Sequence, residues 1–219
     1  RLCDTLSHEL TLSPKQLYEL EQTLRHGLTL TVLYHDRELL NIETGDTSKD
    51  HFGIAVDIGT TTVVSYLYDL TSGACVDIVS GLNAQKSFGA DVISRIDYTT
   101  QNPDGLMILS GRIVRQITDM AKQLLDQNGI EASALSAFTF AGNTTMMHLL
   151  CGVSPQGIAS SPFIPVMTRG RLIRANEIGI RINPYCTAMI LPCVSAYVGA
   201  DTIAAMAAVE MQKGQKALL

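Results

Sequence analysis

The spacing of hydrophobic and polar residues divides the chain into two regions with different patterns. Over residues 14–26 leucines recur every three or four positions, which is typical of a helix with one apolar face. Residues 28–43 then alternate between apolar and polar side chains, and this favours a two-stranded hairpin. The polar stretch 44–50 predicts a linker. We therefore expect residues 1–48 to form a small α+β unit that ends in a linker.

Three neighbouring residues mark the start of the first helix. Ser13 can cap the helix, Pro14 suits its first position, and Gln16 completes a capping box with Ser13. Together they predict that the helix begins at residue 14.

A second pattern begins at Phe52. Three runs of apolar and β-branched residues across 53–81, separated by short turns, predict an antiparallel meander. Helical and strand-like runs alternate after it, and residues 153–187, which carry several prolines, are expected to be mostly loop. The expected helices cover residues 89–98, 106–129, 143–152 and 198–212, and the expected strands cover residues 135–141 and 189–191.

The order of these elements is three strands, helix, strand, helix, strand, helix. It is the order of one lobe of the actin, sugar-kinase and heat-shock chaperone ATPases. The fold class expected for residues 49–219 is therefore α/β, an actin-like (ribonuclease H-like) ATPase lobe with a mixed sheet, preceded by the small α+β segment. A second lobe repeats the first in this fold class. Because no internal repeat is visible, we expect the chain to be a piece of a longer protein.

Composition narrows the classes of function. Hydrophobic residues make up 46% of the 219 residues and charged residues 17%, a balance that suits a well-buried core. The formal charge is −5 and no long run of Lys or Arg occurs, so we expect no nucleic-acid partner and no anionic membrane surface. No apolar run is long enough to span a bilayer.

The five cysteines are scattered along the chain, and no two of them are separated by two residues. The sequence therefore contains no zinc or iron–sulfur ligand motif. An odd number of scattered thiols is typical of the reducing cytosol, and we expect a cytoplasmic protein.

The run Asp57–Thr62 carries the strongest candidate chemistry. An aspartate at a strand end, here Asp57, can hold Mg²⁺ through water. Gly59 allows the backbone to approach a phosphate group closely, and the N–H groups and hydroxyls of Thr60, Thr61 and Thr62 can bind the phosphate oxygens. The alternative is an ordinary hairpin with a polar turn, but the strands on both sides and the later order of elements favour phosphate binding.

A second candidate site follows the strand expected at 135–141. Gly142, Asn143 and Thr144 lie between that strand and a helix N-terminus, where an anion or ordered water is well placed. The alternative, a plain helix cap, also applies to Asn143. Asp201, at the start of the alanine-rich helix, is a weak candidate for a catalytic acid or base, and helix capping is the favoured interpretation.

Two further features are weaker. The stretch 83–91 combines a turn with a cap at Asp91, and its alternative is a surface for a partner or the nucleotide, with Asn83 and Lys86 as the residues to test. His148 lies among apolar residues of a helix, so a core histidine is favoured over a ligand.

Several of these motifs together resemble one family, the ATP-dependent reductive activators of corrinoid proteins. The resemblance covers about residues 31–208. The residues that carry it are Ala55–Val64, Asn83–Gln85, Gly89–Ile96, Ala141–Met146 and Gly199–Asp201.

The resemblance implies a larger protein that passes an electron from an N-terminal [2Fe–2S] domain to a Co(II) corrinoid, giving Co(I), with ATP and Mg²⁺ as cofactors. Its partner would be a corrinoid iron–sulfur protein or the corrinoid subunit of a methyltransferase. Residues 1–48 would end a middle domain and residues 49–219 would form the first ATPase lobe. The cluster domain and the second phosphate motif would lie outside this chain, so the chain alone is expected to turn over little ATP.

Other classes stay open from the sequence. A small-molecule kinase of the same superfamily would need a catalytic base such as Asp201, and an activator of acyl-CoA dehydratases would need cluster-binding cysteines. A non-enzymatic actin-like scaffold is a third alternative. Exposed small residues at Ala204, Ala205 and Ala208 also predict self-association, in the simplest case as a homodimer.

Overall fold

The structure is a computed structural model that describes residues 12–26, 29–35 and 37–209. The chain divides into two compact units, Arg1–His51 and Phe52–Leu219. The division lies three residues after the boundary expected between residues 48 and 49. In the described residues no helix is both long and apolar enough to cross a membrane.

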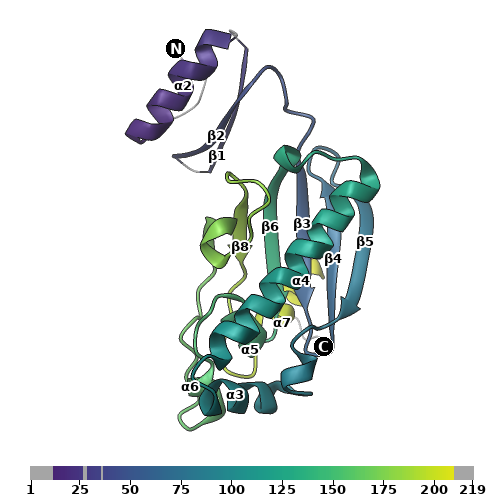
Figure 1. Cartoon of the computed structure of the whole chain (residues 1–219), viewed down its shortest axis with the longest axis vertical. Helices are drawn as coiled ribbons and strands as arrows, with labels where there is room; N and C mark the ends of the chain where they lie inside the picture. Colours follow the sequence, from purple (N-terminus) through teal and green to yellow (C-terminus); the bar gives the residue numbers. More distant parts are fainter. Residues whose placement is uncertain (1–11, 27–28, 36, 210–219) are drawn as a thin grey trace. The chain divides into compact units, whose positions relative to one another are not determined.

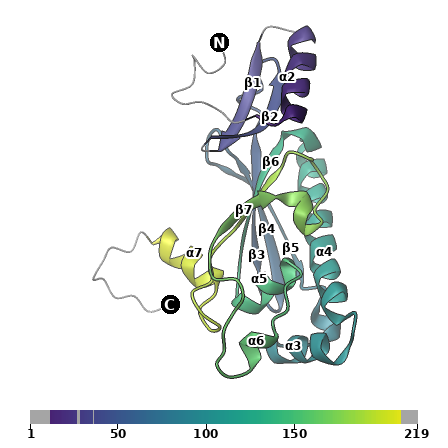
Figure 2. The ribbon, with the colours of Figure 1, turned by 90° about the vertical axis from the view of Figure 1, so that its left-hand side faces the viewer.

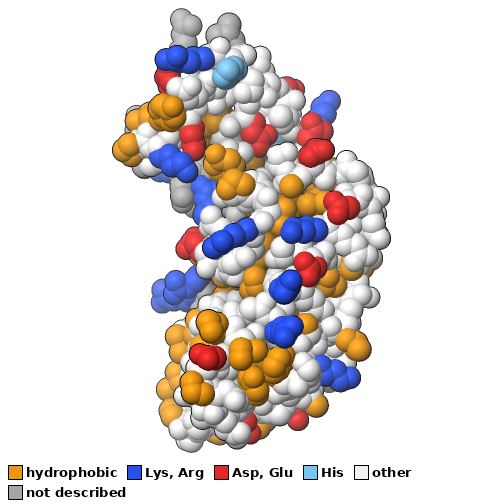
Figure 3. Space-filling view, in the orientation of Figure 1, with side chains coloured by type: hydrophobic (Ala, Val, Ile, Leu, Met, Phe, Trp, Pro, Cys, Tyr) orange, Lys and Arg blue, Asp and Glu red, His pale blue; other side chains and the backbone are white. Residues whose placement is uncertain are grey.

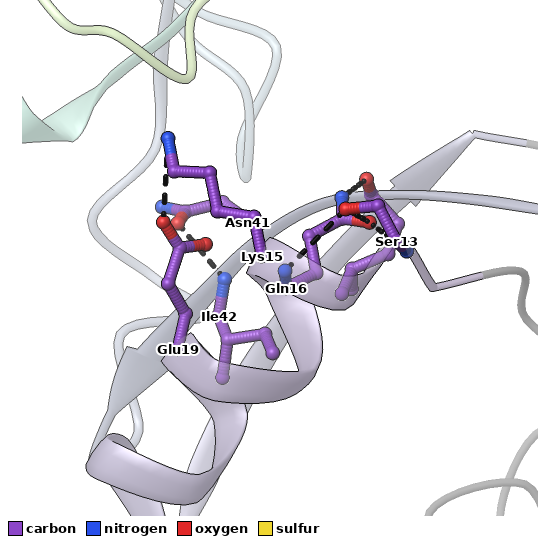
Figure 4. A network of polar contacts seen from close by, with 7 residues as sticks. Ser13, Lys15, Gln16, Glu19, Asn41 and Ile42 are labelled. Atoms are coloured by element: carbon purple, nitrogen blue, oxygen red, sulfur yellow. Dashed lines mark hydrogen bonds and ion pairs between the residues drawn. The ribbon is translucent and has the colours of Figure 1, made fainter.

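The first unit contains one helix and one hairpin. Helix α2 spans Pro14–His26, and strand β1 (Leu30–His35) pairs antiparallel with β2 (Glu38–Thr44). The predicted capping box is present, because the Ser13 N–H donates to Gln16 Oε1 at 2.8 Å and the Gln16 N–H donates to Ser13 Oγ at 3.4 Å. Gln16 Nε2 also donates to the Leu39 carbonyl at 2.6 Å, which ties the start of α2 to β2 (Figure 4).

The second unit is built on one six-stranded sheet in the order β5-β4-β3-β6-β8-β7 (Figures 1 and 2). The β3–β4, β4–β5 and β7–β8 pairs are antiparallel, and the β3–β6 and β6–β8 pairs are parallel. The sheet is therefore mixed, as predicted. The strands span Phe52–Ile58 (β3), Thr62–Asp69 (β4), Cys75–Leu82 (β5), Leu135–Gly142 (β6), Arg171–Arg174 (β7) and Thr187–Ile190 (β8).

Helices cover both faces of this sheet. Figure 2 shows α4 on one side and α7 on the other. The solvent-facing side of α4 carries Arg and Lys side chains interspersed with Asp (Figure 3). The α-helices span Val92–Gln101 (α3), Gly105–Asn128 (α4), Thr144–Leu150 (α5), Gln156–Ala159 (α6) and Ala200–Ala208 (α7), and short 3₁₀ turns occur at Lys86–Phe88, Ala132–Ala134 and Ala175–Ile178.

The core lies between α4 and the sheet. Alternate residues of β3 point into it, and those side chains are at most 2% exposed. The matching side of α4 is buried at every third or fourth position, and burial of each such side chain contributes about 1.5–3 kcal/mol. The core residues of these two elements include Ile54, Val56, Ile58, Leu109, Ile113, Ile117 and Leu124.

Residues 153–187 are mostly loop, as predicted, but they also contain short elements that the sequence did not indicate. The stretch contains α6 and the edge strand β7, which pairs antiparallel with β8. Four residues are too few to show an alternating pattern, and pairing with β8 rather than local propensity defines β7. Helix α3 begins at Val92 and not at residue 89, because Asp91 is its N-cap. The expected end of the last helix, residue 212, lies outside the described residues.

Candidate functional site

Three chain segments meet at one end of the second unit's sheet, where strands β3 and β6 terminate. Because β3 and β6 are parallel, their carboxyl ends lie side by side, with Asp57 opposite Ala141 and Ile58 opposite Gly142. Gly199, before α7, packs onto the same end, since a Cβ on it would lie 2.6 Å from Asn143 Cα. In open α/β sheets this end is where ligands commonly bind.

Asp57 lies on the face of β3 opposite the core residues, and its side chain is exposed. Its carboxylate accepts no hydrogen bond from a described residue. Although the side chain is exposed overall, desolvation of its carboxyl raises the pKa of Asp57, and the negative charge of Asp201 raises it further. The two carboxylates therefore repel each other, and a cation bound between them and a ligand would relieve that repulsion.

Residues distant in the sequence donate hydrogen bonds to the backbone carbonyls of the turn after β3. Asn83 Nδ2 donates to the Gly59 carbonyl at 2.8 Å, and Arg95 Nη2 donates to the Thr60 carbonyl at 2.5 Å. The Asn83 N–H donates to the Thr61 carbonyl at 2.8 Å. Three successive carbonyl groups are thus directed into the lobe.

Because these carbonyls accept hydrogen bonds, the orientation of the following N–H groups, those of residues 60–62, is also defined. These peptide bonds are trans, so the C=O of one residue and the N–H of the next point in opposite directions. The N–H groups of Thr60, Thr61 and Thr62 therefore point away from Asn83 and Arg95. The Thr60 and Thr61 amides donate no hydrogen bond to any residue that the structure describes. Successive free amides of this kind bind anions such as phosphate.

Asn143 joins the turn to the second segment. It caps α5, accepting from the Met146 N–H at 3.0 Å, and its Nδ2 donates to Thr60 Oγ1 at 3.0 Å. Gly142 packs against β3, because a Cβ on it would lie 2.8 Å from the Ile58 carbonyl oxygen. A glycine at this position is what allows the two strand ends to approach so closely.

Thr144 and Asp201 do not have the roles that the sequence predicted, which were anion binding for Thr144 and helix capping for Asp201. Thr144 is buried, and its hydroxyl donates to the Ser195 carbonyl at 2.7 Å, so it supports the loop before α7 and does not face the turn. Asp201 is exposed in the first turn of α7, where a negative charge is favourable, but the N-cap is Gly199. Its Oδ1 accepts from the Thr202 N–H at 2.7 Å.

His148 is a buried histidine with both ring nitrogens occupied, as predicted. Nδ1 contacts the Thr144 carbonyl at 2.7 Å, and Nε2 lies 3.1 Å from the Val166 N–H and 3.3 Å from the Met167 N–H. Nε2 must accept these two bonds, so Nδ1 carries the proton. Among the described residues, no three His, Cys, Asp or Glu side chains form a group that could hold a metal ion.

The main residue that sequence reasoning left out of the site is Arg95. It is buried, although it lies on a helix with exposed polar residues. The available signal was its spacing, because Arg95 follows Val92 by three positions and so shares the inward face of α3. The sequence left open that Asn83 belongs to a partner surface, but the residue is 1% exposed and its side chain holds the turn.

A mixed sheet of this strand order, with a glycine–threonine turn between its first two strands, defines the class: one lobe of an actin-like ATPase fold. The chain belongs to the RACo middle region family, whose sequence model matches residues 52–214. The matched range lies within Phe52–Leu219, the unit that carries the candidate site.

Two relatives extend the comparison. The corrinoid activation enzyme RamQ of Eubacterium limosum is 33% identical over 178 residues, which cover 81% of this chain and 30% of RamQ. The solved structure of a reductive activator for corrinoid, iron–sulfur protein matches with a TM-score of 0.84 and 37% identity, over 90% of this chain and 32% of that one. The chain thus spans about a third of the length of each of these relatives.

Proposed function

We propose that this chain is the first ATPase lobe of a reductive activase that converts Co(II) corrinoid proteins to the Co(I) state. The names of the two relatives support this function. The observation that carries the nucleotide part is the turn at residues 59–61, whose carbonyls are bound from behind and whose amides are directed outward. Residues 1–48 would then end a preceding domain, and residues 49–219 would form the lobe.

The residues of the site fit Mg²⁺-ATP. The amides of Thr60, Thr61 and Thr62 would bind phosphate oxygens, with Gly59 keeping the turn tight. Asp57 would hold Mg²⁺ through water, and Asp201 would orient a water molecule of the same shell or accept its proton. Gly142 and Asn143 would form the second wall of the phosphate site. Thr144 would keep the neighbouring loop in place.

The electron must come from elsewhere, because ATP is not a reductant. A reduced [2Fe–2S] cluster in the longer protein would supply the one electron that converts one Co(II) centre to Co(I). ATP favours this transfer by stabilising the complex in which the cobalt is easier to reduce. The partner is a corrinoid iron–sulfur protein or the corrinoid subunit of a methyltransferase. The free thiols of Cys75, Cys151, Cys186 and Cys193 suit a cytoplasmic setting.

The test is Asp57→Ala in the full-length protein. Mg²⁺-ATP binding is expected to weaken by about tenfold to a hundredfold, with a parallel loss of ATP-dependent Co(I) formation followed by optical spectroscopy, while the fold is retained. Asp69→Ala is the matched control, because Asp69 lies in the other hairpin turn. Normal ATP-dependent cobalt reduction by Asp57→Ala would refute the assignment of the site.

A further inference from the structure

Arg95 is a buried charge next to the candidate phosphate site. The residue is 0% exposed, and its side-chain hydrogen bonds to described residues all go to neutral groups. Nε donates to the Gly89 carbonyl at 3.0 Å, and Nη2 donates to the Thr60 carbonyl at 2.5 Å. Nη1 contacts Gln85 Oε1 at 3.2 Å and Met146 Sδ at 3.1 Å.

No carboxylate forms an ion pair with Arg95 within the described residues. Asp91 is near enough for its charge to act on the guanidinium, but it is exposed and its Oδ1 accepts from the Ser94 N–H at 2.8 Å. Burial lowers the pKa of Arg95, yet an arginine stays charged at neutral pH. A buried charge without a counter-ion is strongly unfavourable, so buried charges are normally paired.

The position of Arg95 indicates what can balance this charge. Its Nη2 binds the Thr60 carbonyl, and the N–H at the other end of that peptide group belongs to Thr61. A charged donor on the carbonyl polarises the peptide and strengthens its N–H as a donor. The positive charge of Arg95 therefore acts, through one polarised peptide group, on any ligand that the Thr61 amide binds.

We propose that Arg95 is a positioning residue for the phosphate chain, and that the ligand's phosphate groups supply the counter-charge that the lobe itself lacks. The inference rests on the phosphate-binding part of the proposed function and deepens it. Arg95 does not touch the ligand. It orients the turn and adds a positive potential that grows in importance with each negative charge on the ligand.

The segment that encloses Arg95 supports this role. A Cβ on Gly89 would lie 2.9 Å from Arg95 Cγ and 2.8 Å from the Arg95 backbone nitrogen, so the chain passes directly over the side chain. Gln85 is 0% exposed, and its Nε2 donates to the Leu109 carbonyl at 2.9 Å. The guanidinium is thus anchored between α4 and the turn, which fixes its distance from the phosphate site.

The experiment compares Arg95→Gln and Arg95→Lys with two other variants in the full-length protein. Asn83→Ala removes a bond to the turn without changing charge. Arg112→Gln removes one positive charge at an exposed position on α4, where the guanidinium lies 5.6 Å from the Phe88 ring centroid. Affinities for Mg²⁺-ATP, Mg²⁺-ADP and AMP are measured by calorimetry.

Arg95→Gln is expected to weaken Mg²⁺-ATP binding by about tenfold to a hundredfold, Mg²⁺-ADP binding less, and AMP binding least. Arg95→Lys should lose affinity but keep the wild-type ratio between the three ligands, because it keeps the charge. Asn83→Ala should weaken all three ligands equally, and Arg112→Gln should change each by less than about twofold.

A purely structural Arg95 would give equal losses for ATP, ADP and AMP in the Gln variant, and that result would overturn the inference. If Arg95→Gln does not fold, the lysine variant decides, since loss of the wild-type ratios there would equally overturn it. A wild-type protein that binds none of the three ligands would instead refute the proposed function. Normal wild-type binding with an unaffected Arg95→Gln would refute the inference alone.

Discussion

The meander of the second unit contains two hairpin turns that are built in opposite ways. The turn between β4 and β5 closes on itself. Asp69 accepts from the Thr71 N–H at 2.8 Å and from the Ser72 hydroxyl at 2.6 Å, and Gly73 adopts a φ of 73°. The side chains of this turn thus satisfy its own backbone, as in many surface turns.

The turn at residues 59–61 depends on the rest of the lobe. Asn83 and Arg95 bind its carbonyls, Asn143 binds the hydroxyl of Thr60, and the nearby Asp57 makes no hydrogen bond with a described residue. A glycine–threonine turn is therefore not by itself a binding site. What separates the two turns is whether distant residues take up the carbonyls and leave the amides free.

The largest expected difference between the two turns is in nucleotide affinity, when the glycine of each turn, Gly59 or Gly73, is replaced by alanine. Gly59→Ala would place a Cβ 2.6 Å from the Thr62 carbonyl oxygen, so the turn must shift. A displacement of about 1 Å in such a site can weaken function by about a hundredfold, and Mg²⁺-ATP affinity should fall accordingly. Gly73→Ala meets no atom within 4 Å and should only cost about 1–2 kcal/mol of stability through its positive φ.

Calorimetry for nucleotide affinity and urea denaturation for stability measure the two glycine variants side by side. A Gly73→Ala variant that lost nucleotide binding as severely as Gly59→Ala would contradict the distinction between the turns.

A second prediction concerns a loop in which the amides, and not the carbonyls, are captured. His148 Nε2 accepts from the amides of Val166 and Met167, so that loop has no free donors there for an anion. His148→Ala should lower the free energy of unfolding by about 2–4 kcal/mol, because it leaves a cavity and unpaired buried groups. Nucleotide affinity should change by less than about threefold, since the residue lies outside the proposed site.

The same histidine predicts a pH dependence. Burial lowers the pKa of His148, so the folded protein resists its protonation more than the unfolded chain does. Stability is fully present above about pH 6.5, the ordinary histidine value, and decreases as the pH falls from there toward the lowered pKa. Thermal denaturation between pH 7.5 and 5 should show a decrease that is smaller in His148→Ala; equal slopes would contradict it.

A smaller effect, on the melting temperature, is expected when Asp69 or Asp57 is replaced by alanine. Hydrogen bonds from Ser72 and Thr71 lower the pKa of Asp69, so its contribution to stability is fully present above the ordinary aspartate value of about 3.9 and is lost as the pH falls from there through the lowered pKa. The pKa of Asp57 is raised, so the fold is relatively favoured when this carboxyl is protonated. At pH 7, Asp69→Ala should therefore lower Tm and Asp57→Ala should leave it unchanged or raise it, as measured by calorimetry.

The smallest predicted effect tests whether each site is built within one chain. Ala205 is exposed on α7, and a homodimer through this alanine-rich face would bring two lobes together. Ala205→Glu should shift any dimer toward monomer in sedimentation experiments and leave Mg²⁺-ATP affinity within about twofold. A large loss of affinity would show that the partner chain completes the site.

The sequence predicted the local features well. The capping box at Ser13 and the strand–turn–strand around Gly59 both depend on neighbouring residues, and such signals are visible in a single sequence. The four-residue strand β7 was missed because its pairing with β8 defines it.

The candidate site was predictable only in part, for the same physical reason. Asp57 and the threonines are marked by their own motif, whereas the hydrogen bonds that orient the turn span 24 residues from Asn83 and 35 residues from Arg95. No local pattern reports such bonds. Thr144 shows the reverse case, since its motif indicated a ligand residue while a distant carbonyl at Ser195 takes its hydroxyl.

The hydrogen bonds to the three carbonyls at residues 59–61 also affect the rates of nucleotide binding and release. A turn whose conformation is already fixed loses little conformational entropy when a ligand arrives, so binding needs no slow rearrangement. Association should then be limited by diffusion and charge, and nucleotides should differ mainly in how long they stay bound. Residence time would thus become the quantity by which this lobe distinguishes a nucleotide before and after its last phosphate is removed.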